Sequence, residues 1–254
     1  MYQLGFIGTG VMSGAMLEAI LAKRFVQPGE ILVYDKNPAM SGRFGVKIAE
    51  SASEVAAQCE IIQLGVKPQD LDALLRGLDL DEKLVISIAA GVMLDKLPAR
   101  GVRLVPNINA AIGQSITAYC ATEQVTQEEL AWVKRYCECF GKAVAIEEKH
   151  ASAFFVLAGS APAFVYLFID ELARAGVAAG LPKSLALEIA AQTALGSAAM
   201  IQQTQAHPYE LVDRVCSPGG ITIAGINALR EHGFAHAVSQ AVLAAWHRDR
   251  ALGK

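Results

Sequence analysis

The chain has 254 residues, enough for one large domain or two modest ones with a buried core. A formal net charge of −3 and a pI of about 6.0 argue against the basic stripes that bind nucleic acids or anionic membranes, so a small-molecule enzyme fits better. The five cysteines form an odd, scattered set, which predicts free thiols in a reducing compartment rather than a disulfide framework. We therefore expect a cytoplasmic protein.

Two apolar stretches resemble targeting or membrane segments. No basic region precedes the N-terminal stretch, since Lys23 follows it, so a cleaved signal peptide is not expected. The stretch Ala151–Ile169 carries no charge and approaches the length of a membrane helix, but Gly159–Pro162 interrupts it. We expect a chain break there, with Ser160 capping a new helix and Pro162 in its first turn, and no membrane span.

The first part of the chain alternates short apolar runs with helical stretches, the pattern of a parallel sheet flanked by helices. The predicted strands are Leu4–Ile7, Ile31–Tyr34, Val46–Ile48, Ile61–Leu64, Leu84–Ile88, Arg103–Val105, Thr117–Cys120 and Val144–Ile146. The predicted helices are Met12–Ala22, Ser53–Ala57, Asp70–Leu75 and Gln127–Cys139. The β signals stop at about residue 150.

The remainder is alanine-rich and helical. The predicted helices run from Pro162 to near Gly180, from a cap at Ser184 to about Gln203, and over Pro208–Val215, Thr222–Glu231 and Phe234–Ala251. Their apolar surface exceeds what one small helical domain can bury by itself. We therefore expect a homodimer formed through this part, with higher assembly left open.

A glycine-rich turn lies between the first predicted strand and the first predicted helix. The first glycine of a G-x-G-x-x-G/A motif permits a tight turn, the second lets phosphates approach the backbone, and the helix N-terminus offers free N–H groups. Ser13 occupies the third position, where glycine or alanine is usual. The cofactor-binding residues predicted here are Gly8, Thr9, Gly10, Val11 and Met12.

NADH and NADPH differ at the adenosine ribose, which carries a 2′-OH in NADH and a 2′-phosphate in NADPH. Asp35 follows the second predicted strand, where an acidic residue binds the ribose 2′-OH, and this favours NADH. The alternative is that Lys36 beside it, with Arg43 nearby, attracts a 2′-phosphate, or that both cations are simply solvated, so the preference tilts only slightly to NADH. NADPH and NADH both stay open as cofactors.

Two C-terminal segments, His207–Leu211 and Val215–Gly225, closely resemble the signature of pyrroline-5-carboxylate reductases. Five further segments match in the same order: Phe6–Gly8, Val66–Gln69, Ser87–Gly91, Pro106–Asn107 and Gly159–Ala163. The resemblance covers essentially the whole chain. It implies an α/β fold in which an N-terminal Rossmann dinucleotide-binding domain, residues 1–150, precedes an all-α domain for dimerisation and substrate binding, residues 151–254.

The same resemblance implies an oxidoreductase that transfers a hydride from NADPH or NADH to the C=N bond of 1-pyrroline-5-carboxylate to give L-proline. This imine reductase activity is the last step of proline biosynthesis. The family segments at the ends of predicted strands, where ligands of open sheets bind, add further cofactor residues. They are Val66, Lys67, Pro68, Ala89, Ala90, Gly91 and Asn107.

The Ser-Pro-Gly-Gly loop before the helix at Thr222 is the expected substrate site. Its glycines expose backbone amides that can hold a carboxylate without an arginine, which assigns Gly219, Gly220, Ile221 and Thr222 to substrate binding. Ser217 and Thr222 are the catalytic candidates, because Thr222 matches the family's threonine expected to hydrogen-bond the ring nitrogen. The alternative is an ordinary glycine loop capped by Ser217, with Thr222 as a helix cap.

Four positions depart from the family pattern, and all lie near cofactor or substrate segments. They are Val11, Ala52, Ala161 and the pair Ile108-Asn109, which replaces Thr-Pro. The departures keep open a divergent paralogue acting on another cyclic imine or hydroxy acid, and a non-catalytic nucleotide-binding regulator. No metal is expected, since Cys137 and Cys139 lack a second pair and Gly233 interrupts the His232–His236 spacing.

Overall fold

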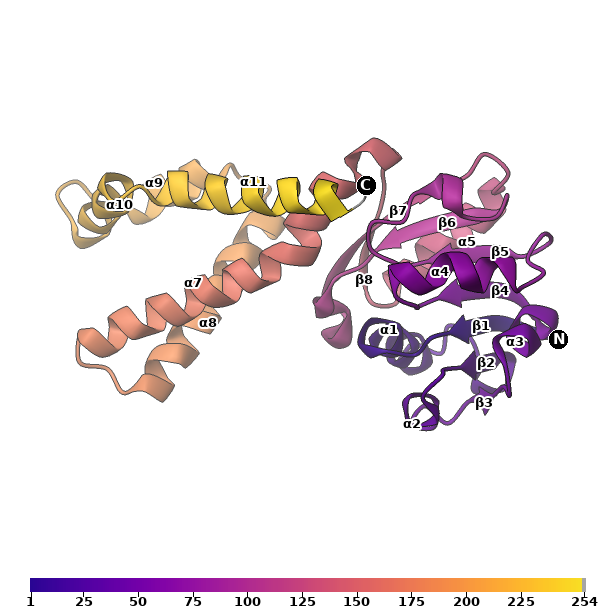
Figure 1. Cartoon of the computed structure of the whole chain (residues 1–254). Helices are drawn as coiled ribbons and strands as arrows, with labels where there is room; N and C mark the ends of the chain where they lie inside the picture. The colour runs from indigo at the N-terminus through magenta and orange to yellow at the C-terminus, as the bar shows by residue number, and fades with distance from the viewer. Residues whose placement is uncertain (253–254) are drawn as a thin grey trace. The chain divides into compact units, whose positions relative to one another are not determined.

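The computed structural model describes residues 1–252, so the last two residues of the second predicted domain lie outside the described residues. Two compact units emerge, a sheet unit formed by Met1–Ser160 with the chain from Trp246, and a helical unit formed by Ala161–Ala245 (Figure 1). The predicted fold class, a Rossmann-type α/β domain followed by helices, is confirmed. The domain boundary at residue 150 stays a prediction.

The sheet unit is built on eight strands in the order β3-β2-β1-β4-β5-β6-β7-β8. The strands are β1 (Tyr2–Ile7), β2 (Ile31–Tyr34), β3 (Lys47–Ile48), β4 (Cys59–Leu64), β5 (Leu84–Ser87), β6 (Gly101–Val105), β7 (Ser115–Ala121) and β8 (Gly141–Ala145). The chain reverses its direction of travel across the sheet between β1 and β4. Crevices that bind ligands form at such a switch point, outside the carboxyl ends of the strands.

The sheet is not wholly parallel, so that part of the prediction is wrong. β7 runs antiparallel to β6, with Val102 opposite Ala121 and Val105 opposite Ala118. The link between them holds only the short 3₁₀ helix η3 (Ile108–Ile112). A parallel return needs a crossover of a dozen or more residues, usually a helix, so the short link dictates the antiparallel pairing.

Helices cover both faces of this sheet. They are α1 (Val11–Ala22), α2 (Pro38–Ser41), α3 (Ala52–Gln58), α4 (Pro68–Arg76) and α5 (Gln127–Glu138), with 3₁₀ turns η1 (Pro28–Glu30), η2 (Leu94–Lys96) and η4 (Glu148–His150). Successive strand residues point to opposite faces. Phe6 packs with Met16 of α1 and Tyr136 of α5 in one cluster, whereas Ile7 packs with Val55 of α3 in another. The first cluster holds α1 against the sheet, directly after β1.

A continuous helical stretch replaces the break predicted at Gly159–Pro162. It consists of α6 (Ala151–Phe154), a π-helical segment η5 (Phe155–Ser160) and α7 (Ala161–Ala178). Ser160 therefore starts no new helix, and that prediction is wrong. Pro162 has no N–H to donate within an α-helix, and the wider π turn absorbs this loss. Gly159 leaves room for the Phe155 ring, because a Cβ there would lie 2.9 Å from it.

The helical unit continues with α8 (Lys183–Thr204), α9 (Pro208–Val215), α10 (Ile221–Glu231) and α11 (Phe234–Leu252), whose last turns belong to the sheet unit. The predicted cap at Ser184 is wrong: α8 starts after Pro182, whose fixed φ already suits a helix start. Small residues let α7 and α8 approach closely through Ala173, Ala186 and Ala190.

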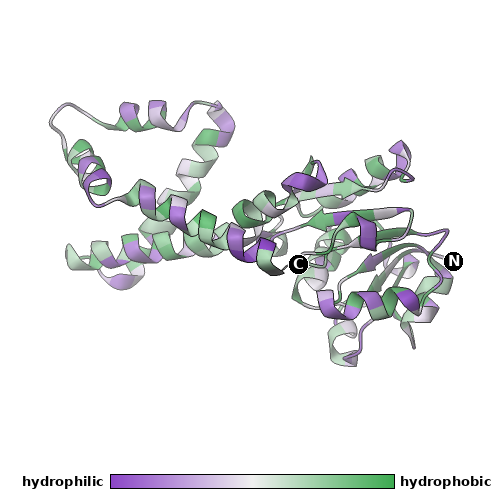
Figure 2. Ribbon diagram, turned by 45° about the horizontal axis from the view of Figure 1, so that its top comes forward, coloured by the Kyte–Doolittle hydropathy of each residue, from purple (hydrophilic) through white to green (hydrophobic). Residues whose placement is uncertain are grey.

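Hydrophobic residues recur along the long helices (Figure 2). Many of those on α7 and α8 are exposed. By length and composition alone, Glu148–Ala178 and Lys183–Thr204 are long and apolar enough to cross a membrane. Both helices therefore need a covering surface, either lipid or protein.

Candidate active site

The turn between β1 and α1 has the geometry that a bound diphosphate requires. Gly8 has a φ of +92°, which only glycine adopts readily, and its N–H donates to the Tyr34 carbonyl at 2.8 Å. Gly10 is the N-cap of α1, and a Cβ there would meet no atom within 4 Å. The first turn of α1 contains no acidic side chain. The residues present therefore fit an anionic group at this helix N-terminus.

A cleft of about 630 Å³ opens beside this turn, at the carboxyl ends of β1, β2 and β4. Its lining is Ile7, Gly8, Gly10, Tyr34, Asp35, Lys36, Gly65, Val66, Lys67, Gln69, Asp70, Ala73 and Leu74. The structure thus brings together six of the predicted cofactor residues, which come from three separate parts of the sequence.

Asp35 braces the glycine-rich turn. Its carboxylate accepts hydrogen bonds from the Thr9 N–H at 2.6 Å and the Asn37 N–H at 2.9 Å, and the Thr9 hydroxyl lies 3.3 Å from it. Thr9 is fully buried, so its side chain belongs to this brace. The sequence did not predict that bracing role. The predicted contact between Asp35 and the ribose stays a prediction.

A second cavity, of about 170 Å³, joins the start of α1 to the loops after β5 and β6. It is lined by Met12, Ile88, Ala89, Ala90, Gly91, Arg103, Leu104, Val105, Pro106, Phe155 and Asp249. Four of the predicted cofactor residues therefore lie together here. Phe155 and Asp249 were missed, because an apolar helix and a C-terminal helix give no local signal of a site.

The polar groups around this second cavity are paired. Arg103 lies 3.4 Å from the Glu148 carboxylate, which also accepts a hydrogen bond from the Leu94 N–H at 2.6 Å. The Ser152 hydroxyl donates to Asp249 at 2.6 Å. These contacts tie the loop after β5 to the start of the long helix.

The remaining predicted cofactor residues lie at element boundaries. Val11 is the first residue of α1 and is 75% exposed, and Pro68 is the first residue of α4. Asn107 is buried, and its side-chain carbonyl accepts the Asn109 N–H at 3.0 Å, which caps η3. The structure gives Asn107 a capping role that the sequence did not predict.

The predicted substrate loop is a tight turn in the helical unit. The Gly220 N–H donates to the Ser217 carbonyl at 3.0 Å, and Pro218 and Gly219, at φ +66°, occupy the central positions, the pattern of a type II turn. In the described chain no side chain caps α10, whose N-cap is Gly220. The alternative of a Ser217 cap is therefore wrong. A Cβ at Gly220 would lie 2.2 Å from the Ser217 hydroxyl.

The residues after this turn are open to solvent. Ile221 is 94% exposed and Thr222, the second residue of α10, is exposed as well. Thr222 lies within the helix, so it is not the cap. The head of α10 thus presents backbone N–H groups and a hydroxyl side by side, which suits a carboxylate with a neighbouring polar atom.

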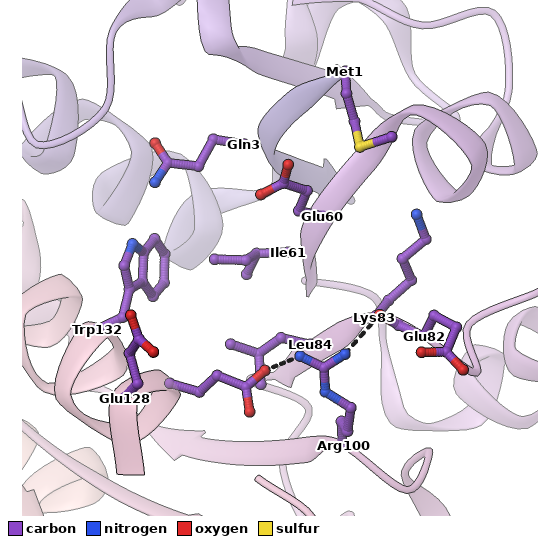
Figure 3. A pocket seen from close by; sticks show the side chains of 11 residues that line it. Met1, Gln3, Glu60, Ile61, Glu82, Lys83, Leu84, Arg100, Glu128 and Trp132 are labelled. Carbon is purple, nitrogen blue, oxygen red and sulfur yellow. Dashed lines mark hydrogen bonds and ion pairs between the residues drawn. The ribbon is translucent and has the colours of Figure 1, made fainter. Parts of the chain in front are cut away.

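A third cavity, of about 470 Å³, lies at the opposite, amino ends of β1, β4 and β5 (Figure 3). Arg100 donates to the Glu129 carboxylate and to the Glu82 carbonyl at 2.8 Å, and Glu129 accepts the Thr126 N–H at 2.8 Å in a capping box. Burial alone would raise the pKa of Glu129, but the bonds from Thr126 and Arg100 outweigh it and lower the pKa. We assign this cluster a structural role.

Cys137 and Cys139 are both buried. Burial raises the pKa of Cys139 to about 11 and that of Cys137 further, so both thiols stay protonated. Among residues 1–252, no group of three His, Cys, Asp or Glu side chains is placed to hold a metal ion.

The left-handed glycine after β1, the open helix N-terminus and the cleft at the switch point define a dinucleotide-binding protein of the Rossmann class. Residues 3–91 match a family described as NADP oxidoreductase, coenzyme F420-dependent, and residues 148–252 match pyrroline-5-carboxylate reductase dimerisation. The chain is 40% identical to the pyrroline-5-carboxylate reductase of Escherichia coli, with 99% of this chain and 98% of the relative covered. The chain belongs to the pyrroline-5-carboxylate reductase family.

Other relatives agree with this assignment. The pyrroline-5-carboxylate reductase of Synechocystis sp. is 39% identical, with 99% of this chain and 98% of the relative covered. A crystal structure of the Plasmodium falciparum pyrroline carboxylate reductase with NADP bound superposes with a TM-score of 0.91 at 30% identity, covering 100% of this chain and 98% of the other. The Streptococcus pyogenes enzyme superposes with a TM-score of 0.88 at 35% identity, with 98% of each chain covered.

Proposed function

We propose that this protein reduces 1-pyrroline-5-carboxylate to L-proline with NADPH or NADH, the last step of proline biosynthesis, as a cytoplasmic homodimeric imine reductase. One observation carries the proposal: a single chain holds both an open dinucleotide cleft and an exposed Ser217–Gly220 turn at the head of α10. The chain is related over 99% of its length to reductases with this name.

On the cofactor side, the backbone N–H groups of the first turn of α1, next to the unobstructed Gly10, would hold the diphosphate. Lys36 and Lys67 line the cleft and offset the negative charge of the phosphates, and a 2′-phosphate would find Lys36 beside Asp35. The bound cofactor supplies the hydride. The loop Ala89–Gly91 and Met12 shape the cavity proposed for its ring.

On the substrate side, the amides of Gly219 and Ile221 hold the carboxylate of the imine acid. The Gly220 N–H is already donated to the Ser217 carbonyl, so Gly220 contributes by closing the turn that presents these amides. The Thr222 hydroxyl orients the ring nitrogen by a hydrogen bond, and Ser217 supports the turn and lies next to the reacting centre. A protonated imine is already electrophilic, so the protein has to supply mainly orientation and exclusion of water. No acid–base pair of side chains is needed for this reaction.

We propose residues 1–150 as the dinucleotide-binding domain and 151–254 as the dimerisation and substrate-binding domain. The exposed apolar side chains of α7 and α8 include Val165, Tyr166, Leu167, Phe168, Leu172, Val177, Leu185, Leu187, Ile189, Leu195 and Met200. A second copy covers them better than a bilayer does, because the Asp170–Arg174 ion pair lies on α7 and the family's dimerisation region coincides with these helices. Light scattering of the purified protein measures whether it is a dimer or a larger assembly.

The test is an NADPH- and NADH-oxidation assay with pyrroline-5-carboxylate and with a panel of other cyclic imine acids, in which proline formation is measured directly. Thr222→Ala should cut turnover and leave cofactor affinity unchanged, which separates the two sites. Turnover of another imine in preference to pyrroline-5-carboxylate would identify a divergent paralogue. Cofactor binding without turnover of any imine acid would overturn the proposal in favour of a regulator.

A further inference from the structure

Three polar side chains are buried in the core of the sheet unit, next to the dinucleotide cleft. Ser13 of α1 is 1% exposed, and Gln63 of β4 and Tyr136 of α5 are fully buried. Buried polar groups destabilise a fold unless they form hydrogen bonds. These side chains therefore have to satisfy one another, and the bonds among them constrain the three elements that carry them.

The side chains form one chain of hydrogen bonds. The Tyr136 hydroxyl donates to the Gln63 side-chain carbonyl, and the Gln63 amide donates to the Ser13 hydroxyl at 3.2 Å. Burial raises the pKa of Tyr136 well above its usual value, so its hydroxyl keeps its proton and remains a donor. These hydrogen bonds connect α5, the central strand β4 and the first turn of α1 on one face of the sheet.

Ser13 stands where the third glycine of the motif is usual. Its hydroxyl lies where the loop after β1, at Gly8, touches the loop after β4, at Gly65. A Cβ at Gly65 would come within 1.9 Å of the Ser13 hydroxyl oxygen, and a Cβ at Gly8 would come within 2.7 Å of the Gly65 carbonyl oxygen. Gly8 and Gly10 form one wall of the cleft, and Gly65 leads into the other wall at Val66 and Lys67. The position of Ser13 thus sets how closely the two walls approach.

We propose that Gln63 is a positioning residue for the dinucleotide: anchored by Tyr136, it holds Ser13 and the first turn of α1 against Gly65 and thereby sets the width of the cleft. The inference rests on the proposed function only in taking the cleft to bind a nicotinamide dinucleotide. Gln63 touches no part of that ligand's cleft itself and acts through Ser13.

The test compares NADPH affinity, measured by fluorescence titration without substrate, with thermal stability. Gln63→Leu and Tyr136→Phe each leave buried partners unpaired, so both properties should fall. The triple variant Ser13→Ala/Gln63→Leu/Tyr136→Phe removes all three hydrogen-bonding groups together and leaves no partner unpaired. Its stability should therefore return toward that of the wild type. We expect its NADPH Kd to remain raised by roughly 3- to 10-fold, since no hydrogen bond from Gln63 then holds the first turn of α1 against Gly65.

Val133→Ala is the matched control, because Val133 is fully buried on the same helix as Tyr136 and takes no part in the hydrogen bonds. It should lower the melting temperature by creating a cavity and leave the NADPH Kd unchanged. A stable triple variant with wild-type NADPH affinity would overturn the inference, because the hydrogen bonds among these three side chains would then contribute to stability alone. Should the triple variant fail to fold, Ser13→Ala alone decides, and an unchanged Kd there counts against the inference. The titration contains no imine, so it measures NADPH binding alone. Its result therefore does not depend on whether the protein reduces an imine.

Discussion

Gly10→Ala is the most direct perturbation of the dinucleotide cleft. Gly10 has a φ of −59°, which alanine adopts without strain, and its Cβ would meet no atom within 4 Å. The substitution should therefore change the free energy of unfolding by less than about 0.5 kcal/mol, or raise it slightly by restricting the unfolded chain. The added methyl group instead occupies the space that the diphosphate has to enter.

The expected loss is one hydrogen bond between a backbone N–H group and a phosphate oxygen. A hydrogen bond to a charged group contributes about 1.5–3 kcal/mol, so the NADPH Kd should rise roughly 10- to 150-fold. Fluorescence titration measures the Kd, and thermal unfolding followed by circular dichroism measures stability. The informative result is a raised NADPH Kd with an unchanged melting temperature, because it assigns the loss to the binding site and not to folding.

Gly8→Ala provides the contrast. Its φ of +92° and the Gly65 carbonyl oxygen 2.7 Å from the added Cβ leave no room for a side chain, so this variant should lose stability as well as binding. If Gly10→Ala binds NADPH as tightly as the wild type, the phosphates do not pass over Gly10 and the proposed orientation of the cofactor is wrong.

Three further predictions follow from the fold. Asp35→Ala should raise the Kd of NADH more than that of NADPH; equal losses would mean that Asp35 acts only by bracing the glycine-rich turn. Glu129→Gln should cost roughly 1–2 kcal/mol at pH 7, because a lowered pKa stabilises the fold while the carboxylate is charged. This cost should begin to shrink as the pH falls below the pKa of an unfolded glutamate and disappear once the pH has passed the lower pKa of Glu129 in the folded protein; chemical denaturation at pH 7 and at acidic pH checks this, and an equal cost at acidic pH contradicts it. Of the five thiols, a thiol reagent should modify Cys216 in the folded protein and the others only after denaturation, because those four are buried with raised pKa values; fast reaction of a second thiol would contradict the packing.

The strands and most helices could be predicted because the sequence marks them locally. Short apolar runs such as Ile31–Tyr34 and Ile61–Leu64 are buried strands. The glycines at 8 and 10 directly follow β1, another such run. The direction of β7 could not be predicted in the same way, because apolar alternation is identical in parallel and antiparallel strands. Only the length of the link before it carries that information.

The helix errors have a different cause. Gly159 and Pro162 disfavour an α-helix, so a break at this position was the natural expectation. The helix instead widens into a π turn, since packing between Phe155 and Gly159 makes the continuous form favourable. A contact of this kind depends on which turn forms, and helix propensities carry no information about it.

The candidate site was predictable where backbone conformation defines it and less so where side chains do. Positive φ at Gly8 and Gly219 requires glycine, and both positions were identified. The roles of Gln63 and Tyr136 were not, because a lone glutamine in a strand and a tyrosine in a helix are ordinary on their own. Their hydrogen bond forms only when α5 packs on the face of the sheet that carries the Gln63 side chain, so it depends on the tertiary fold.

The contact between Gly8 and Gly65 limits how sequences of this fold can vary. Each glycine leaves no space for a Cβ because the backbone of the other loop, or Ser13 beside it, already fills that space. A side chain at either position would push the loops apart and open the cleft. Random mutagenesis followed by selection for activity should therefore return variants that keep both glycines.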